Sequence, residues 1–224
     1  MKKLVFILFF ILYAIILSAQ SFYKGALVVD ANVGIEIYDT KYTYKLKNSS
    51  LDTTLNDKAG NRNFSIGAEY GIIDRLGVGL RFKSNNYFVS KDNVTGVTPY
   101  VSSYDYMVTA NFHAVKSNVF NLVTGINFGG SHLNYVSNDI NNNRIYGNGT
   151  YFDFHIYPRI YIKRFAFEFN ISVPFVSYTN MTSNNPAFNT YVIAKWKGTG
   201  YNIGTGIAFR FLDKKEKSTA SLKN

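Results

Sequence analysis

Three histidines, with the acids and hydroxyls near them, are the residues of this sequence whose types could support catalysis. His132 directly follows Ser131, and His155 stands two positions after Asp153. A histidine and an acid activate a serine nucleophile only when the three side chains meet. Neighbouring residues of a β-strand point to opposite faces, so Ser131 and His132 do not meet. Asp153 and His155 share the inward face, a spacing that is common by chance, and no nucleophile has the right geometry beside them. We therefore predict no catalytic residues, and we expect the third histidine, His113, near a short turn.

Other chemical motifs are missing from the sequence. It contains no cysteine, and it shows no metal-ligand spacing, no glycine-rich phosphate loop and no nucleic-acid motif. We expect neither a cofactor nor a metal, and no nucleic acid as partner. The formal net charge of +10 points instead to anionic lipid head groups as the counter-charge.

Charged residues of both signs recur at alternate positions inside otherwise apolar segments. Because buried charges persist only when they are paired, we predict a network that fills the interior of the fold. A narrow path for ions is the alternative, but a ring of one sign or a continuous polar channel is not evident. The predicted inward residues are Asp30, Glu36, Glu69, Arg81, Lys83, Asp105, His113, Asp153, His155, Arg159, Glu168 and Arg210.

The elements that position these residues are segments with strict period-two alternation. In 201–211 the odd positions carry Tyr, Ile, Thr, Ile, Phe and Phe, and the even positions carry Asn, Gly, Gly, Ala and Arg. This alternation is typical of a strand with one face in hydrocarbon and the other in a crowded barrel interior. The predicted strands are 25–38, 64–72, 78–88, 104–114, 120–129, 152–162, 165–175 and 201–211.

Long and short connections alternate along the chain. Short turns are predicted at 74–76, 116–118 and 163–164, and long polar loops at 39–61, 90–99, 137–149 and 178–200, of which 190–196 is strand-like and could extend the last hairpin. We expect a local irregularity or bulge at Pro158. The fold class is all-β: an eight-stranded antiparallel up-and-down transmembrane barrel with short periplasmic turns and four long extracellular loops.

The chemistry of the two faces decides which one points outward. A soluble carrier of the lipocalin type would expose many Lys and Glu, whereas the polar face here is rich in Gly, Ser, Asn and Ala. Small residues fit the tight lumen of an eight-stranded barrel, so the aromatic and aliphatic face is expected to meet lipid. Tyrosines near the strand ends should then form an interfacial girdle: Tyr38, Tyr87, Tyr104, Tyr106, Tyr151, Tyr178 and Tyr201.

Hairpin register predicts which inward charges meet. A two-residue turn at 163–164 places Arg159 directly opposite Glu168. The same reasoning with Ile72 opposite Val78 places Glu69 opposite Arg81, and strand 201–211 should bring Arg210 to the other flank of Glu168.

The termini complete the domain assignment. Met-Lys-Lys, an apolar run and Ser-Ala-Gln form a cleavable signal peptide over 1–19, with cleavage after Ala19. Residues 20–212 form the barrel, and 213–224 are a charged, disordered periplasmic tail. We expect export by the general secretory pathway.

The alternating strands and the aromatic last strand resemble the small eight-stranded outer-membrane barrels of Gram-negative bacteria, the OmpA-like, OmpX-like and opacity-type group. The resemblance implies an integral outer-membrane location among lipid and lipopolysaccharide, and insertion by the barrel assembly machinery. The residues suited to the assembly signal are Tyr201, Ile207, Phe209 and Phe211, although further residues follow them. The tail is too short for a peptidoglycan-binding domain.

The function expected from this resemblance is non-enzymatic. We expect a membrane structural or surface-interaction protein that acts through its extracellular loops and has a side-chain-filled lumen. A narrow porin-like channel for small solutes or ions is one alternative. A second alternative is an enzyme that modifies lipid A. The partner of the loops is left open.

Overall fold

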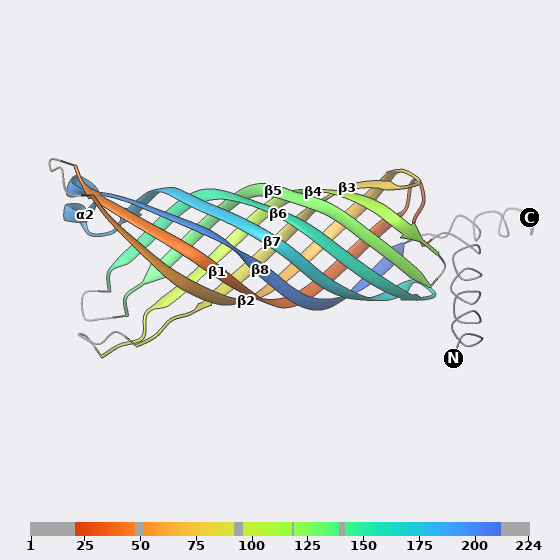
Figure 1. The fold of residues 1–224 in the computed structure, drawn as a ribbon, viewed down its shortest axis with the longest axis horizontal. Helices are drawn as coiled ribbons and strands as arrows, with labels where there is room; N and C mark the ends of the chain where they lie inside the picture. The colour runs from red at the N-terminus through yellow and green to blue at the C-terminus, as the bar shows by residue number, and fades with distance from the viewer. Residues whose placement is uncertain (1–20, 48–51, 92–95, 118, 139–141, 212–224) are drawn as a thin grey trace, which may run out of the picture.

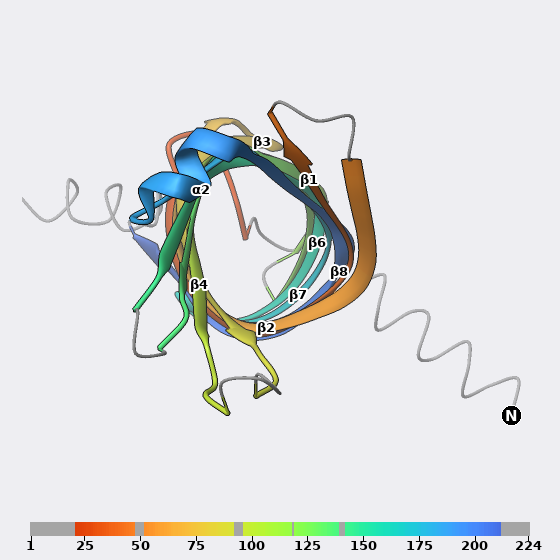
Figure 2. The same ribbon diagram turned by 90° about the vertical axis from the view of Figure 1, so that its left-hand side faces the viewer.

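A computed structural model describes residues 21–47, 52–91, 96–117, 119–138 and 142–211. The predicted signal peptide, its cleavage site and the charged tail lie outside these described residues. The structure is a closed barrel in which each strand pairs with its neighbours in sequence and β1 pairs with β8 (Figures 1 and 2). No helix within the described residues is long and apolar enough to cross a membrane.

The elements follow one another as an antiparallel meander. They are β1 Leu27–Leu46, β2 Asp52–Ile73, β3 Leu76–Phe88, β4 Tyr100–Lys116, β5 Phe120–Val136, β6 Arg144–Ile162, β7 Phe165–Ser183, α2 Pro186–Tyr191 and β8 Val192–Phe211. The short turns after β2, β4 and β6 lie at one end, here called the turn end, where β1 begins and β8 ends. The opposite end, called the hairpin end, carries α2 (Figure 1). The predicted eight-stranded barrel is confirmed.

Each strand places apolar side chains outward and polar side chains inward, because the side-chain period of a strand is two. On β8, Tyr201, Ile203 and Ile207 are exposed on the outer wall, while Asn202 and Arg210 are buried in the lumen. The outer wall is therefore the apolar surface and the core is polar, which is the reverse of a water-soluble barrel.

The strands are longer than predicted at the hairpin end. The expected loop 39–61 is largely a continuation of β1 and β2, which remain paired from Glu36↔Asn61 to Lys45↔Asp52. The expected loop 178–200 is also largely wrong, because β7 continues to Ser183, a short helix follows, and β8 begins at Val192. The strand-like character predicted for 190–196 is confirmed from Val192 onward. Thr, Tyr and Lys can continue a hydrogen-bonded strand pair without an apolar environment. The polar composition of these segments therefore did not show where the strands end.

Three departures from a regular ladder lie near the turn end, and one of them is a register shift between β4 and β5 at His113/Val115. Between β2 and β3 the register shifts at Gly71/Ile73, so Tyr70 rather than Ile72 lies opposite Val78. Both Ile72 and Ile73 are exposed, as a bulge requires when it turns two successive residues to one face. At Pro158, by contrast, pairing stops after Ile156↔Ile171 and resumes at Arg159↔Glu168 in the same register, so the irregularity there is a gap without a bulge.

Candidate functional site in the barrel lumen

All twelve residues predicted to point inward are buried in the lumen. Arg159 of β6 has no exposed surface and lies among three carboxylates. Its Nε donates to Glu168 Oε2, its Nη1 lies 3.3 Å from Glu69 Oε2, and its Nη2 lies 3.6 Å from Asp30 Oδ2. Arg81 holds the other Asp30 oxygen, with Nη2 to Oδ1 at 2.7 Å. We call these five residues the arginine network.

The register predictions have mixed outcomes. Arg159 lies opposite Glu168, as predicted. The predicted pairing of Glu69 with Arg81 is wrong, because the bulge at Gly71/Ile73 moves Gly79 opposite Glu69.

The predicted placement of Arg210 is also wrong. Gly206 lies opposite Glu168, and Arg210 lies four positions farther along β8, at the turn end. The Arg210 Nη1 donates to the carbonyl oxygen of Ser21 at 2.8 Å, and its guanidinium carbon lies 5.5 Å from the centre of the Tyr161 ring. Glu168 instead accepts a hydrogen bond from Asn32 Nδ2 at 2.7 Å.

A second cluster surrounds Lys83 on the hairpin side of the lumen. The Lys83 ammonium lies 2.6 Å from Glu36 Oε1 and 3.5 Å from Asp105 Oδ2, and it donates to the Tyr151 hydroxyl at 2.7 Å. Glu36 also accepts a hydrogen bond from Tyr38. We call Lys83, Glu36 and Asp105 the lysine cluster, and the phenol groups satisfy the oxygens that one ammonium cannot reach.

The two inward histidines each bridge an acid and an amide. His113 Nε2 lies 2.8 Å from Glu69 Oε1, and its Nδ1 lies 3.1 Å from Asn121 Oδ1. His155 Nδ1 lies 3.0 Å from Asp153 Oδ1, and its Nε2 lies 2.8 Å from Asn111 Oδ1. The predicted common face of Asp153 and His155 is thus confirmed.

A glycine makes room for His155. A Cβ at Gly125 would lie 2.4 Å from Ala110 O, 2.5 Å from Asn111 Oδ1 and 2.6 Å from His155 Nε2. Only a residue without a side chain fits between these groups, so the small residues of the inner face determine which polar groups can meet.

The serine at the hairpin side does not form a nucleophile–base pair. Ser131 Oγ donates to Asp105 Oδ1 at 2.5 Å and lies 2.7 Å from the Tyr178 hydroxyl. His132 points to the outer wall, where its Nδ1 lies 2.8 Å from Asn148 Oδ1. Among the described residues there is also no group of three or more His, Asp or Glu that could hold a metal ion.

Tyrosines close the lumen above the lysine cluster. Tyr38, Tyr151 and Tyr178 are buried and pack with Met107, Leu133 and Val176, with Tyr87 and Trp196 against them. We call this group the aromatic cluster. The predicted girdle is therefore wrong for Tyr38, Tyr87, Tyr151 and Tyr178, because they occupy the alternate positions of their strands that face inward. Tyr104, Tyr106 and Tyr201 are exposed.

The chain before β1 closes the lumen at the turn end. Ser21, Phe22, Tyr23 and Ala26 are buried although they precede the first strand. The Phe22 ring stacks on His113 with ring centres 3.5 Å apart. We call residues 21–26 the N-terminal segment, which sequence reasoning missed because no alternation marks so short a stretch. Asparagines were placed on the polar, inward face by alternation, but their hydrogen bonds to the buried acids were not predicted.

The residues predicted as an assembly signal lie on the last strand. Tyr201, Ile207 and Phe211 are exposed on the outer wall. Phe209 is half-buried, and its ring centre lies 4.8 Å from those of Phe165 and Phe211. Their role in assembly stays a prediction.

Comparison with known proteins gives a structural likeness only. No protein-family model matches the chain, and no curated protein matches it either. The outer membrane protein OprG from Pseudomonas aeruginosa is 11% identical, with a TM-score of 0.54 over 87% of this chain and 100% of that chain. Neisserial surface protein A is 8% identical, with a TM-score of 0.46 over 84% of this chain and 100% of that chain. The resemblance is thereby confirmed for the fold alone: the chain is a closed, eight-stranded antiparallel β-barrel, similar in fold to the outer membrane protein OprG.

Proposed function

We propose that the protein is a non-conducting integral outer-membrane protein whose hairpin end serves as a membrane structural or surface-interaction element. The observation that carries this proposal is the filling of the lumen at three levels: the N-terminal segment, the arginine network with the lysine cluster, and the aromatic cluster. What remains for interaction is the outer wall and the hairpins that continue beyond the apolar band.

The channel alternative is less well supported. Selective ion paths use a ring of one sign or a continuous wet channel, whereas here each arginine and lysine of the lumen contacts a carboxylate or a backbone oxygen. The alternative of an enzyme that modifies lipid A finds no support at Ser131, which contacts an acid and a phenol rather than a histidine base.

Planar-bilayer recording of the refolded protein tests the proposal. We expect no stable single-channel steps, whereas a porin reconstituted in the same way gives them as the positive control. Folding and insertion are verified by heat-modifiable migration on a gel, so that an absence of conductance is not confused with failed folding. A stable, large conductance of the wild type would overturn the proposal, and a lipid A hydrolysis assay examines the enzyme alternative.

We further propose that the protein reaches the outer membrane of a Gram-negative cell by Sec export, cleavage after Ala19 and insertion by the barrel assembly machinery. The sequence of the first residues supports export, and the apolar outer wall supports a membrane location. We expect membrane fractions to contain a heat-modifiable species whose N-terminal residue is Gln20. Recovery of the protein in the soluble periplasm, or with an intact N-terminus, would contradict this route.

A further inference from the structure

The outer wall changes abruptly from apolar to basic where β1, β2 and β8 pass beyond the apolar band. On β1 the outward side chains Ile35 and Ile37 are followed by Asp39 and Lys41. On β8, Tyr201 is preceded by Thr199 and Lys197. Five lysines face outward in this region, and we call them the lysine patch: Lys41, Lys45, Lys58, Lys195 and Lys197.

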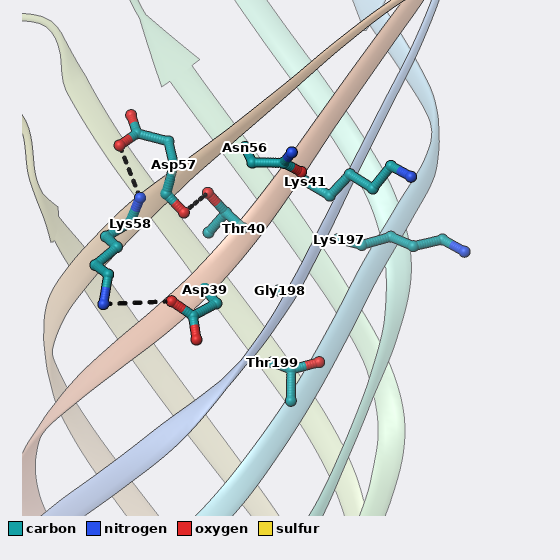
Figure 3. Close-up of a pocket in the computed structure, with 9 residues that line it drawn as sticks. All are labelled: Asp39, Thr40, Lys41, Asn56, Asp57, Lys58, Lys197, Gly198 and Thr199. Carbon is teal, nitrogen blue, oxygen red and sulfur yellow. Dashed lines mark hydrogen bonds and ion pairs between the residues drawn. The ribbon is translucent and has the colours of Figure 1, made fainter.

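The centre of the lysine patch is a like-charge contact. Lys41 and Lys197 lie directly opposite each other across β1 and β8. Side chains in this relation stand roughly 5 Å apart at Cβ, and like charges there are destabilising. Figure 3 shows both side chains extending in the same direction, away from Asp39, beside an open depression of about 740 Å³.

The nearby acids do not neutralise this pair. Asp39 lies 3.6 Å from the ammonium of Lys58. Asp57 accepts from the backbone N–H of Lys58 through its carboxylate, and from Thr40 through its carbonyl oxygen. Within the described part of the chain, no ion pair involves Lys41 or Lys197. Burial, with Tyr44 as the second cause, raises the pKa of the neighbouring Tyr42, so this phenol supplies no negative charge at neutral pH.

The position of the lysine patch selects the kind of anion. Lys41 and Lys197 lie on the outside of the wall, four residues beyond Ile37 and Tyr201. This is the depth of lipid head groups rather than of a partner docking on the loop tips. We propose that Lys41 and Lys197, with Lys195 beside them, bind the phosphate groups of a phosphorylated glycolipid of the outer leaflet. This inference rests on the proposed outer-membrane location and names a lipid partner for it.

Lipid binding by the refolded full-length mature chain tests this inference. Phosphatidylcholine vesicles carrying bisphosphorylated lipid A, or its dephosphorylated form, are compared for the wild type and for Lys41→Gln/Lys197→Gln. The matched control, Lys24→Gln/Lys163→Gln, removes the same charge from exposed sites at the turn end. We expect the patch variant to bind phosphorylated lipid A about 10- to 30-fold more weakly, from roughly 1 kcal/mol per lysine, and the control to bind like the wild type.

A second readout separates binding from a general loss of structure. In phosphatidylcholine alone, Lys41→Gln/Lys197→Gln should unfold at a higher urea concentration than the wild type because the repulsion is removed, and at a lower one when phosphorylated lipid A is present. Equal loss of binding in the control variant, equal affinity for the dephosphorylated lipid, or displacement by millimolar inorganic phosphate would overturn the inference. The vesicle measurement does not depend on where the protein resides in the cell, so its failure is distinct from a failure of the proposed location.

Discussion

Arg159 is the residue on which the interior of the barrel most depends. Its guanidinium carries five donors in one plane, and three carboxylates from three different strands lie around it. With Arg81, the arginine network holds two cations against Asp30, Glu69 and Glu168. Asn32 and His113 also contact these acids. Removal of Arg159 would leave fully buried oxygens without a counter-charge.

We expect Arg159→Met to lower the free energy of unfolding by about 3 to 5 kcal/mol, because breaking a buried ion pair leaves its partner uncompensated. Urea titration of the protein in lipid vesicles, read by gel mobility, measures the change. Lys24→Met is the matched control, since Lys24 is exposed and the change removes the same charge. A loss of equal size in both variants would show that net charge, and not the buried contact, determines stability.

At the scale of elements, the N-terminal segment is held by backbone contacts that require a glycine. Gly25 N donates to Gly71 O at 2.8 Å, and Gly71 N donates to Ala26 O at 2.8 Å. A Cβ at Gly71 would lie 2.4 Å from Tyr23 O, so any side chain there displaces the segment. The bulge between β2 and β3 begins directly after Gly71.

We expect Gly71→Ala to release the N-terminal segment and to destabilise the barrel by about 1 to 3 kcal/mol, the usual cost of overpacking. Hydrogen exchange at Gly25 and Ala26, followed by mass spectrometry, should accelerate. Gly130→Ala is the control, because a Cβ at Gly130 meets nothing within 4 Å. If exchange in the Gly71 variant stays at the wild-type rate, the segment is held by its side chains alone.

The strand pattern could be predicted from the sequence because the alternation of inward and outward residues depends only on neighbouring positions in the chain. Every residue assigned inward from alternation, from Asp30 to Arg210, is buried. Contacts across the lumen could not be predicted, since they depend on register, and one bulge moved Arg81 from Glu69 to Asp30. Tyr38 and Tyr178 were assigned to the interfacial girdle from their position near a strand end and not from the alternation. That prediction was wrong, because both side chains are buried.

At the scale of the whole molecule, the strands are longer than a membrane requires, and the longest are about twice that length. β1 has 20 residues and β2 has 22, whereas a tilted transmembrane strand needs only about 9 to 11. The additional length lies mainly at the hairpin end, so the barrel wall continues as a paired, polar-faced extension beyond the hydrocarbon. This extension carries the lysine patch on its outer face.

Depth in the membrane should determine the cost of a charge on the outer wall. Arg in place of Ile207 or Phe169, both about half exposed in mid-wall, is expected to cost about 2 to 4 kcal/mol, whereas Tyr201→Arg near the edge of the apolar band should cost about 0 to 1 kcal/mol. Reversible unfolding in vesicles measures all three variants. Equal losses at the three positions would mean that the boundary of the apolar band is misplaced.

The arginine network also has a consequence for the order in which the protein folds. All wall pairs join strands that are neighbours in sequence except β1 with β8, and hairpins of this kind close small loops at low entropic cost. Arg159 and Asp30 are far apart along the chain, as are Arg159 and Glu69, and they come within reach only when the ring is nearly shut. A half-assembled sheet therefore has to carry solvated arginines and acids on the face that will become the lumen. The last step, in which β1 meets β8, brings the charges together and removes their water at once. Assembly should for this reason be all-or-none. When denaturant is raised and then lowered, the unfolding transition should occur at a higher denaturant concentration than the refolding transition.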